Sequence, residues 1–141
     1  MGAMTDTISP HTTDETTTTT TNTTSTVTGS ATPYVLAAGE GEHRHLLNHL
    51  ATTKVAPGST GSMTAIEFVA PRGFGPPLHV HGDEDEVMIV LDGEVVFRSV
   101  ETESVATTGA TVFLPHGVPH TFQVLSETAR FATITASNAQ V

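Results

Sequence analysis

Four side chains of the types that bind metal ions occur at spacings that allow them to meet at one ion. His79 and His81 are two residues apart, Glu86 follows after a short acidic turn, and His120 lies much further along the chain. On a β-strand, side chains at positions i and i+2 point to the same face, about 6.6–6.8 Å apart. Two imidazoles on one face can bind the same cation. Glu86 can then supply an oxygen, and His120 can close the site from an opposing sheet.

This donor set narrows the choice of metal. Three imidazoles and one carboxylate without a thiolate suit Fe(II), Mn, Ni, Co, Zn or Cu(II), and disfavour Cu(I). The chain has no cysteine, whereas closed structural zinc sites are often cysteine-rich. Four protein ligands around an octahedral metal leave two positions open to substrate, water or dioxygen. We therefore expect one divalent transition metal per chain, at a reactive site.

The elements that must position these side chains are short β-strands. Apolar runs separated by Gly and Pro predict strands at residues 62–69, 86–91, 94–100, 110–114, 120–125 and 129–136. Asp92-Gly93 is typical of a two-residue hairpin turn. Only residues 43–49 suggest a short helix. Many short strands with turns between them indicate an all-β antiparallel sandwich or barrel.

Strand alternation also predicts a pocket around the candidate ligands. If Glu86 faces inward, the residues two and four positions later do so too, and the same holds for His120. The expected pocket residues are Met88, Val90, Phe97, Phe122 and Val124. An apolar, partly aromatic wall suits a small, flat aromatic substrate, although these side chains can equally be ordinary barrel core.

At this point the sequence resembles the cupin superfamily. Gly73-x5-His79-x-His81-x4-Glu86-x6-Gly93 is similar to the first cupin motif, and Gly109-x5-Pro115-x-Gly117-x2-His120 to the second. The resemblance implies a jelly-roll barrel (a double-stranded β-helix) in which His79, His81, Glu86 and His120 hold the metal.

Two details refine this comparison. Asp83, Glu84 and Asp85 are rivals for the carboxylate position, and Asp85 fits a shorter variant of the motif. The six residues between Glu86 and Gly93 favour Glu86, which leaves the other three as a solvated acidic turn. The second motif usually ends in Asn where this chain has Val124. The family does not use that Asn as a ligand, so the change makes the pocket more apolar.

The resemblance extends to a function. Residues 39–42, 75–79 and 115–120 look like the corresponding parts of quercetin 2,3-dioxygenase-like one-domain cupins. This implies a metal-dependent dioxygenase that opens a flavonol or a related aromatic, with Glu86 as the general base. The alternatives are a non-redox polyketide cyclase or isomerase of natural-product biosynthesis, and a metal-dependent small-molecule-binding protein. The fold cannot decide among these chemistries.

The remaining histidines have plainer interpretations. His116 lies in a tight turn, for which a surface position is the simplest expectation. His43, His45 and His49 form a second group, which we interpret as a solvated entry strand. Proton shuttling at the mouth of the pocket is the alternative for this group.

The composition limits which partners the chain can bind and indicates where its folded domain begins. Fifteen acidic residues against five Lys and Arg give a net charge of −10, which argues against nucleic acid and anionic membranes. Residues 1–33 are Thr-rich and nearly free of bulky apolar side chains, so we expect a disordered tail before a cupin domain at 34–141. The sequence shows no spanning segment and no signal peptide. We expect a soluble cytoplasmic protein and, as in many cupins, a homodimer.

Overall fold

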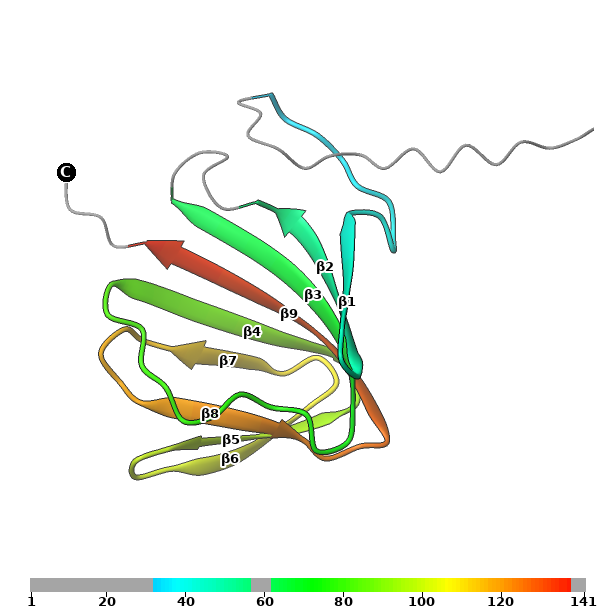
Figure 1. Cartoon of the computed structure of the whole chain (residues 1–141). Helices are drawn as coiled ribbons and strands as arrows, with labels where there is room; N and C mark the ends of the chain where they lie inside the picture. The colour runs from blue at the N-terminus through cyan, green and yellow to red at the C-terminus, as the bar shows by residue number, and fades with distance from the viewer. Residues whose placement is uncertain (1–31, 57–61, 138–141) are drawn as a thin grey trace, which may run out of the picture.

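The computed structural model describes residues 32–56 and 62–137, which fold into β-strands joined by turns and loops (Figure 1). The strands are β1 (Glu42–Leu46), β2 (His49–Val55), β3 (Met63–Pro71), β4 (Glu84–Asp92), β5 (Glu94–Ser99), β6 (Glu103–Thr107), β7 (Thr111–Leu114), β8 (His120–Val124) and β9 (Thr128–Ser137). The predicted all-β class is confirmed. Residues 1–31 of the predicted tail lie outside the described residues, so its disorder stays a prediction.

The strands form two antiparallel sheets that face each other. The larger has the order β1-β2-β3-β9-β4-β7, and the smaller has the order β6-β5-β8. Figure 1 shows the smaller sheet beneath the β4–β7 side of the larger one. No helix in the described part of the chain is long and apolar enough to cross a membrane.

The core lies between the inner faces of the two sheets, and strand alternation decides which side chains enter it. On β4, Glu86, Met88 and Val90 are buried, while the residues between them are partly exposed. On β8, His120 and Val124 are buried. The predicted alternation is therefore correct on both strands. Because the period is two, the register that buries the apolar residues also places a carboxylate and an imidazole in the interior.

Aromatic side chains fill much of this interior. Phe131 of β9 is fully buried, with its ring centroid 5.3 Å from that of Phe68 and 5.4 Å from that of Phe122. Phe97 of β5 lies directly opposite Phe122 of β8 in the smaller sheet. Full burial of such a side chain contributes about 1.5–3 kcal/mol each. The contact between Phe131 of β9 and Phe122 of β8 thus joins the two sheets in the core.

Two local predictions were wrong. Residues 43–49 are not a helix: they run through β1 into a tight turn and the first residue of β2, with Leu46 paired to His49. The Asp92-Gly93 turn does not close a hairpin, because β4 and β5 belong to different sheets. Gly93 has φ 100°, and a Cβ there would lie 2.6 Å from Ser126 Oγ. This glycine therefore allows a crowded corner at which the chain passes from one sheet to the other.

Candidate metal centre

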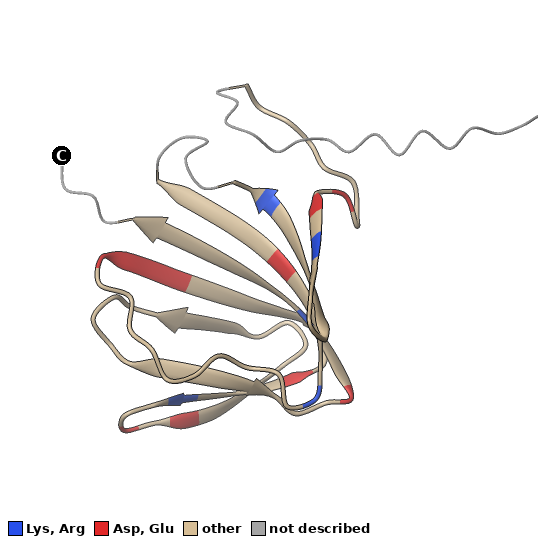
Figure 2. Cartoon of the chain, in the orientation of Figure 1, with Lys and Arg blue, Asp and Glu red and all other residues tan. Residues whose placement is uncertain are grey.

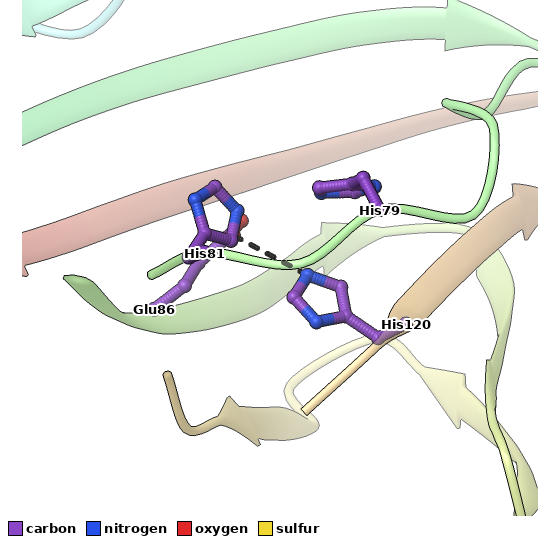
Figure 3. Close-up of side chains that lie close together, drawn as sticks. All are labelled: His79, His81, Glu86 and His120. Carbon is purple, nitrogen blue, oxygen red and sulfur yellow. Dashed lines mark ion pairs between the residues drawn. The ribbon is translucent and has the colours of Figure 1, made fainter. Parts of the chain in front are cut away.

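The structure brings His79, His81, Glu86 and His120 together. One ligand-capable atom from each lies within 4.8 Å of the others (Figure 3). Glu86 and His120 are buried on β4 and β8, while His79 and His81 are partly exposed on the loop that precedes β4. We call these four residues the tetrad. The close approach predicted from the spacing of the motif is present.

Backbone hydrogen bonds hold the His79–His81 segment against β8. The N–H of His79 donates to the carbonyl of His120 at 3.1 Å, and the N–H of His120 donates back at 2.8 Å. The N–H of Gly117 donates to the carbonyl of His81 at 2.7 Å. The strand geometry assumed for the spacing of His79 and His81 is present only as this single bridge. The bridge nevertheless fixes two of the candidate ligands beside a third.

Two of the imidazoles are oriented by backbone carbonyls. The Nδ1–H of His79 donates to the carbonyl of Pro77 at 2.8 Å, and that of His120 donates to the carbonyl of Val118 at 3.0 Å. With the proton on Nδ1, the lone pair of Nε2 is available to a cation. Partners of this kind on the second ring nitrogen are usual for histidines that bind metals.

The remaining contacts test whether a cation fits. Glu86 Oε2 lies 3.1 Å from His81 Nε2 and 3.8 Å from His120 Nε2. His81 Nε2 is buried and has no hydrogen-bond partner among the described residues. A buried carboxylate and a buried ring nitrogen that makes no well-formed hydrogen bond are both costly to desolvate unless something satisfies them. A divalent cation between them would satisfy both, so the donor set fits a transition metal.

Acidic residues colour the beginning of β4 red in Figure 2, and those next to Glu86 in the chain make other contacts. Asp85 Oδ1 accepts hydrogen bonds from the backbone N–H of His116 at 2.9 Å and from its Nδ1–H at 2.7 Å. Glu84 Oε2 lies 3.7 Å from His81 Nδ1, on the outer side of that ring, and Asp83 is exposed. Only Glu86 among the four joins the tetrad. The structure therefore gives Asp85 a different contact, with a half-exposed His116.

Two cavities adjoin the tetrad. The first, of about 240 Å³, touches Glu86 and has an aromatic wall. Its lining residues are Phe68, Phe74, Gly75, Pro76, Glu86, Phe122 and Thr133. The second, of about 310 Å³, touches His120 and Phe97. Of the expected pocket residues, Phe122 lines the first and Phe97 the second. Met88, Val90 and Val124 belong to the fully buried core instead.

Sequence reasoning missed the contribution of β3 and of the loop before His79. Phe74 lies between Phe68 and Phe122, with centroid distances of 6.5 and 6.2 Å. It precedes the first motif histidine by only five positions, but no strand period runs through this Pro- and Gly-rich loop. Its inward direction could therefore not be inferred by parity.

The second histidine group does not form a cluster. His43 and His45 lie exposed on the edge strand β1, as the entry-strand interpretation expects. His49 instead turns inward, with its ring centroid 4.4 Å from that of Phe74. Its Nδ1 is buried without a hydrogen-bond partner in the described part of the chain.

Comparisons with known proteins agree with this geometry. Residues 65–135 match the family model described as the cupin domain. Over 105 residues the chain is 34% identical to quercetin 2,3-dioxygenase of Bacillus subtilis, a match that covers 73% of this chain and 31% of the relative. The chain thus spans about a third of the length of that protein.

Similar solved structures show the same fold. A predicted oxalate decarboxylase from Thermotoga maritima aligns with a TM-score of 0.66 at 18% identity, covering 74% of this chain and 99% of that one. KdgF from Halomonas sp. aligns with a TM-score of 0.64 at 14% identity, covering 74% and 94%. At these identities the similarity concerns the arrangement of strands.

Proposed function

Because the chain belongs to the cupin domain family, we propose that it is a metal-dependent dioxygenase acting on a small aromatic, flavonol-like substrate. One observation carries the proposal: the tetrad opens, at Glu86, onto a cavity walled by Phe68, Phe74 and Phe122. Flat aromatic rings pack well against such walls, in offset or edge-to-face contacts. The 34% identity to quercetin 2,3-dioxygenase supports the same substrate class.

The residues of the tetrad have two roles in this proposal. His79, His81 and His120 would hold the metal together with Glu86. When bound, the metal supplies a Lewis acid that polarises a substrate oxygen and gives access to dioxygen chemistry. Glu86 is the one tetrad member that both offers an anionic oxygen and borders the aromatic cavity. It is therefore placed to accept the proton of a substrate hydroxyl at its carboxylate.

The cavity would assist by positioning and by excluding water. Phe74, on the loop before His79, and Phe122, on β8, lie with ring centroids 6.2 Å apart. A ring held against them would present its hydroxyl to Glu86 in a fixed orientation, which lowers the entropy cost of reaction. The apolar wall would also strengthen electrostatic interactions within the site.

The experiment compares two neighbouring carboxylates. Metal-loaded wild type, Glu86→Gln and Asp85→Asn are assayed for oxygen uptake and for loss of quercetin absorbance, each at saturating metal. We expect Glu86→Gln to lose about 10²–10⁴ in rate, because a general base is removed. Asp85→Asn should retain turnover at saturation, since Asp85 contacts His116 and not the tetrad.

Each contrary result has a clear meaning. Near wild-type turnover by metal-saturated Glu86→Gln would refute the base role. Metal loss in Asp85→Asn together with retention in Glu86→Gln would refute the ligand assignment. No oxygen uptake with any flavonol, across the metals that the donor set accepts, would refute the dioxygenase and favour non-redox chemistry or binding alone.

A further inference from the structure

The imidazole of His81 lies between two carboxylates of one strand. Its Nε2 is 3.1 Å from Glu86 Oε2 within the tetrad (Figure 3), and its Nδ1 is 3.7 Å from Glu84 Oε2. Both glutamates belong to β4 and are two positions apart, so the strand period directs them to the same face. The two nitrogens of one ring therefore face two different carboxylates, of which only Glu86 belongs to the tetrad.

The other two histidines of the tetrad show what the outer nitrogen of such a ring requires. The Nδ1–H groups of His79 and His120 each donate to a backbone carbonyl, that of Pro77 and that of Val118. A partner at this position fixes the orientation of the ring and raises the basicity of the nitrogen that binds the metal. Within the described part of the chain, Nδ1 of His81 makes no hydrogen bond of this kind, and Glu84 is the acceptor that faces it.

The geometry of Glu84 allows a hydrogen bond to His81 to form. Its backbone is fixed, because it pairs with Ser137 at the start of the β4–β9 ladder. Its side chain is 44% exposed, so rotation about the side-chain bonds can close the distance of 3.7 Å, which is longer than a hydrogen bond. A carboxylate is also a stronger acceptor than a carbonyl, because the hydrogen bond is then charge-assisted.

We propose that Glu84 is a positioning residue for the metal centre: its carboxylate accepts the Nδ1–H of His81 and holds the Nε2 lone pair of that ring toward the ion. Two glutamates of β4 then serve one imidazole, Glu86 as its fellow ligand and Glu84 as its support. This inference rests on the metal-binding part of the proposed function and assigns a role to a residue outside the tetrad. It does not depend on the substrate or on the reaction.

The test measures metal affinity in the full chain for wild type, Glu84→Ala, Glu84→Gln and Asp83→Asn. The probe is Zn²⁺ alone, and its Kd is obtained by competition with a chelator. Glu84→Gln keeps the size and an acceptor oxygen but removes the charge. Asp83→Asn is the matched control, because it removes one exposed carboxylate from the same acidic turn. The melting temperature of each metal-free variant should stay within about 2–4 °C of wild type, as is usual for exposed positions.

We expect Glu84→Ala to weaken Zn²⁺ binding about 10-fold, the lower end of the range for losing a partner of this kind. Glu84→Gln should recover part of this affinity, because its amide oxygen can still accept the Nδ1–H. Asp83→Asn should change the Kd less than about 2-fold, since an exposed charge contributes little.

Nuclear magnetic resonance of protein labelled with ¹⁵N-histidine gives a readout that a merely structural role would not change. In Zn²⁺-loaded wild type, the Nδ1–H of His81 should give a slowly exchanging proton resonance, because the hydrogen bond protects it. Glu84→Ala should lose this resonance and keep those of His79 and His120, whose carbonyl partners are untouched.

Several results would overturn the inference. Unchanged Zn²⁺ affinity in Glu84→Ala would do so, as would losses equal to those of Asp83→Asn, which would reveal an effect of net charge alone. No recovery in Glu84→Gln would refute the role of Glu84 as a hydrogen-bond acceptor. Failure of wild type to bind Zn²⁺ or any other divalent transition metal would overturn both this inference and the proposed function. Support from Glu84 without oxygen uptake by wild type would refute the dioxygenase alone.

Discussion

Replacing His79 by alanine should remove most of the thermal stabilisation that a metal gives this protein. Among the residues that the structure describes, the imidazole of His79 makes one hydrogen bond, from Nδ1–H to the carbonyl of Pro77. In the metal-free protein, His79→Ala should therefore cost only about 0.5–1.5 kcal/mol. The bridge to His120 uses backbone atoms, so it remains.

The metal-dependent part is larger. At a free metal concentration 100 times the wild-type Kd, binding stabilises the fold by about 2.7 kcal/mol. Loss of groups that merely orient ligands weakens metal binding about 10–100-fold, so loss of a ligand should weaken it at least 100-fold. The stabilisation then falls to about 0.4 kcal/mol. For a domain of roughly 100 residues, the difference of about 2.3 kcal/mol corresponds to about 9–18 °C in Tm.

The assay measures Tm with and without metal by differential scanning calorimetry, for wild type, His79→Ala and His43→Ala. His43 is a matched control, because its Nδ1 also makes one hydrogen bond, with Thr52 Oγ1 at 2.9 Å, but it lies on the edge strand β1. We expect His43→Ala to keep the full metal-induced gain. An equal gain in His79→Ala and wild type would show that His79 does not bind the metal, and would refute the reasoning from the tetrad.

Three further predictions follow from other parts of the chain. Asp85→Ala should weaken metal affinity about 10-fold, measured by competition with a chelator. The substitution removes the hydrogen bonds that hold the 115–119 loop, and the Val118 carbonyl in this loop orients His120. An unchanged affinity would show that other contacts hold the loop. Gly93→Ala should lower the free energy of unfolding of the metal-free protein, measured in urea, by at least about 1 kcal/mol more than Gly109→Ala. Both glycines have positive φ, but only at Gly93 would a Cβ lie against neighbouring atoms. Equal losses in the two variants would contradict this. Deleting residues 1–30 should leave Tm and metal content unchanged, since this Thr-rich stretch has few apolar side chains to bury; a loss of several degrees would show that it packs on the barrel.

Strand parity made much of the interior predictable. The alternation on β4 and β8 correctly indicated that Glu86 and His120 share a face with Met88, Val90 and Val124. Parity works here because one face of each strand is buried and the side-chain period is fixed. The motif spacing then placed the candidate ligands on neighbouring segments.

Other features depended on pairings that local sequence does not reveal. The strands β2 and β6 were not predicted, and the residues of β1 suggested both an entry strand and a short helix. Their side chains are partly or fully exposed and lack a clear apolar face. The Asp92-Gly93 pair has the same local chemistry in a hairpin and at a corner between sheets. Only the partners of β4 and β5 distinguish the two.

The position of β9 has a consequence for how the chain acquires its metal. β9 is the last strand of the fold in chain order, yet it pairs with both β3 and β4 in the middle of the larger sheet. All four tetrad residues precede it. During synthesis Glu86 therefore emerges on β4 before its neighbour β9 has been made, and such distant pairings form slowly. Until β9 inserts, β3 and β4 expose edges that invite aggregation. A metal ion that binds the tetrad would therefore meet the complete site only after β9 has paired with β4.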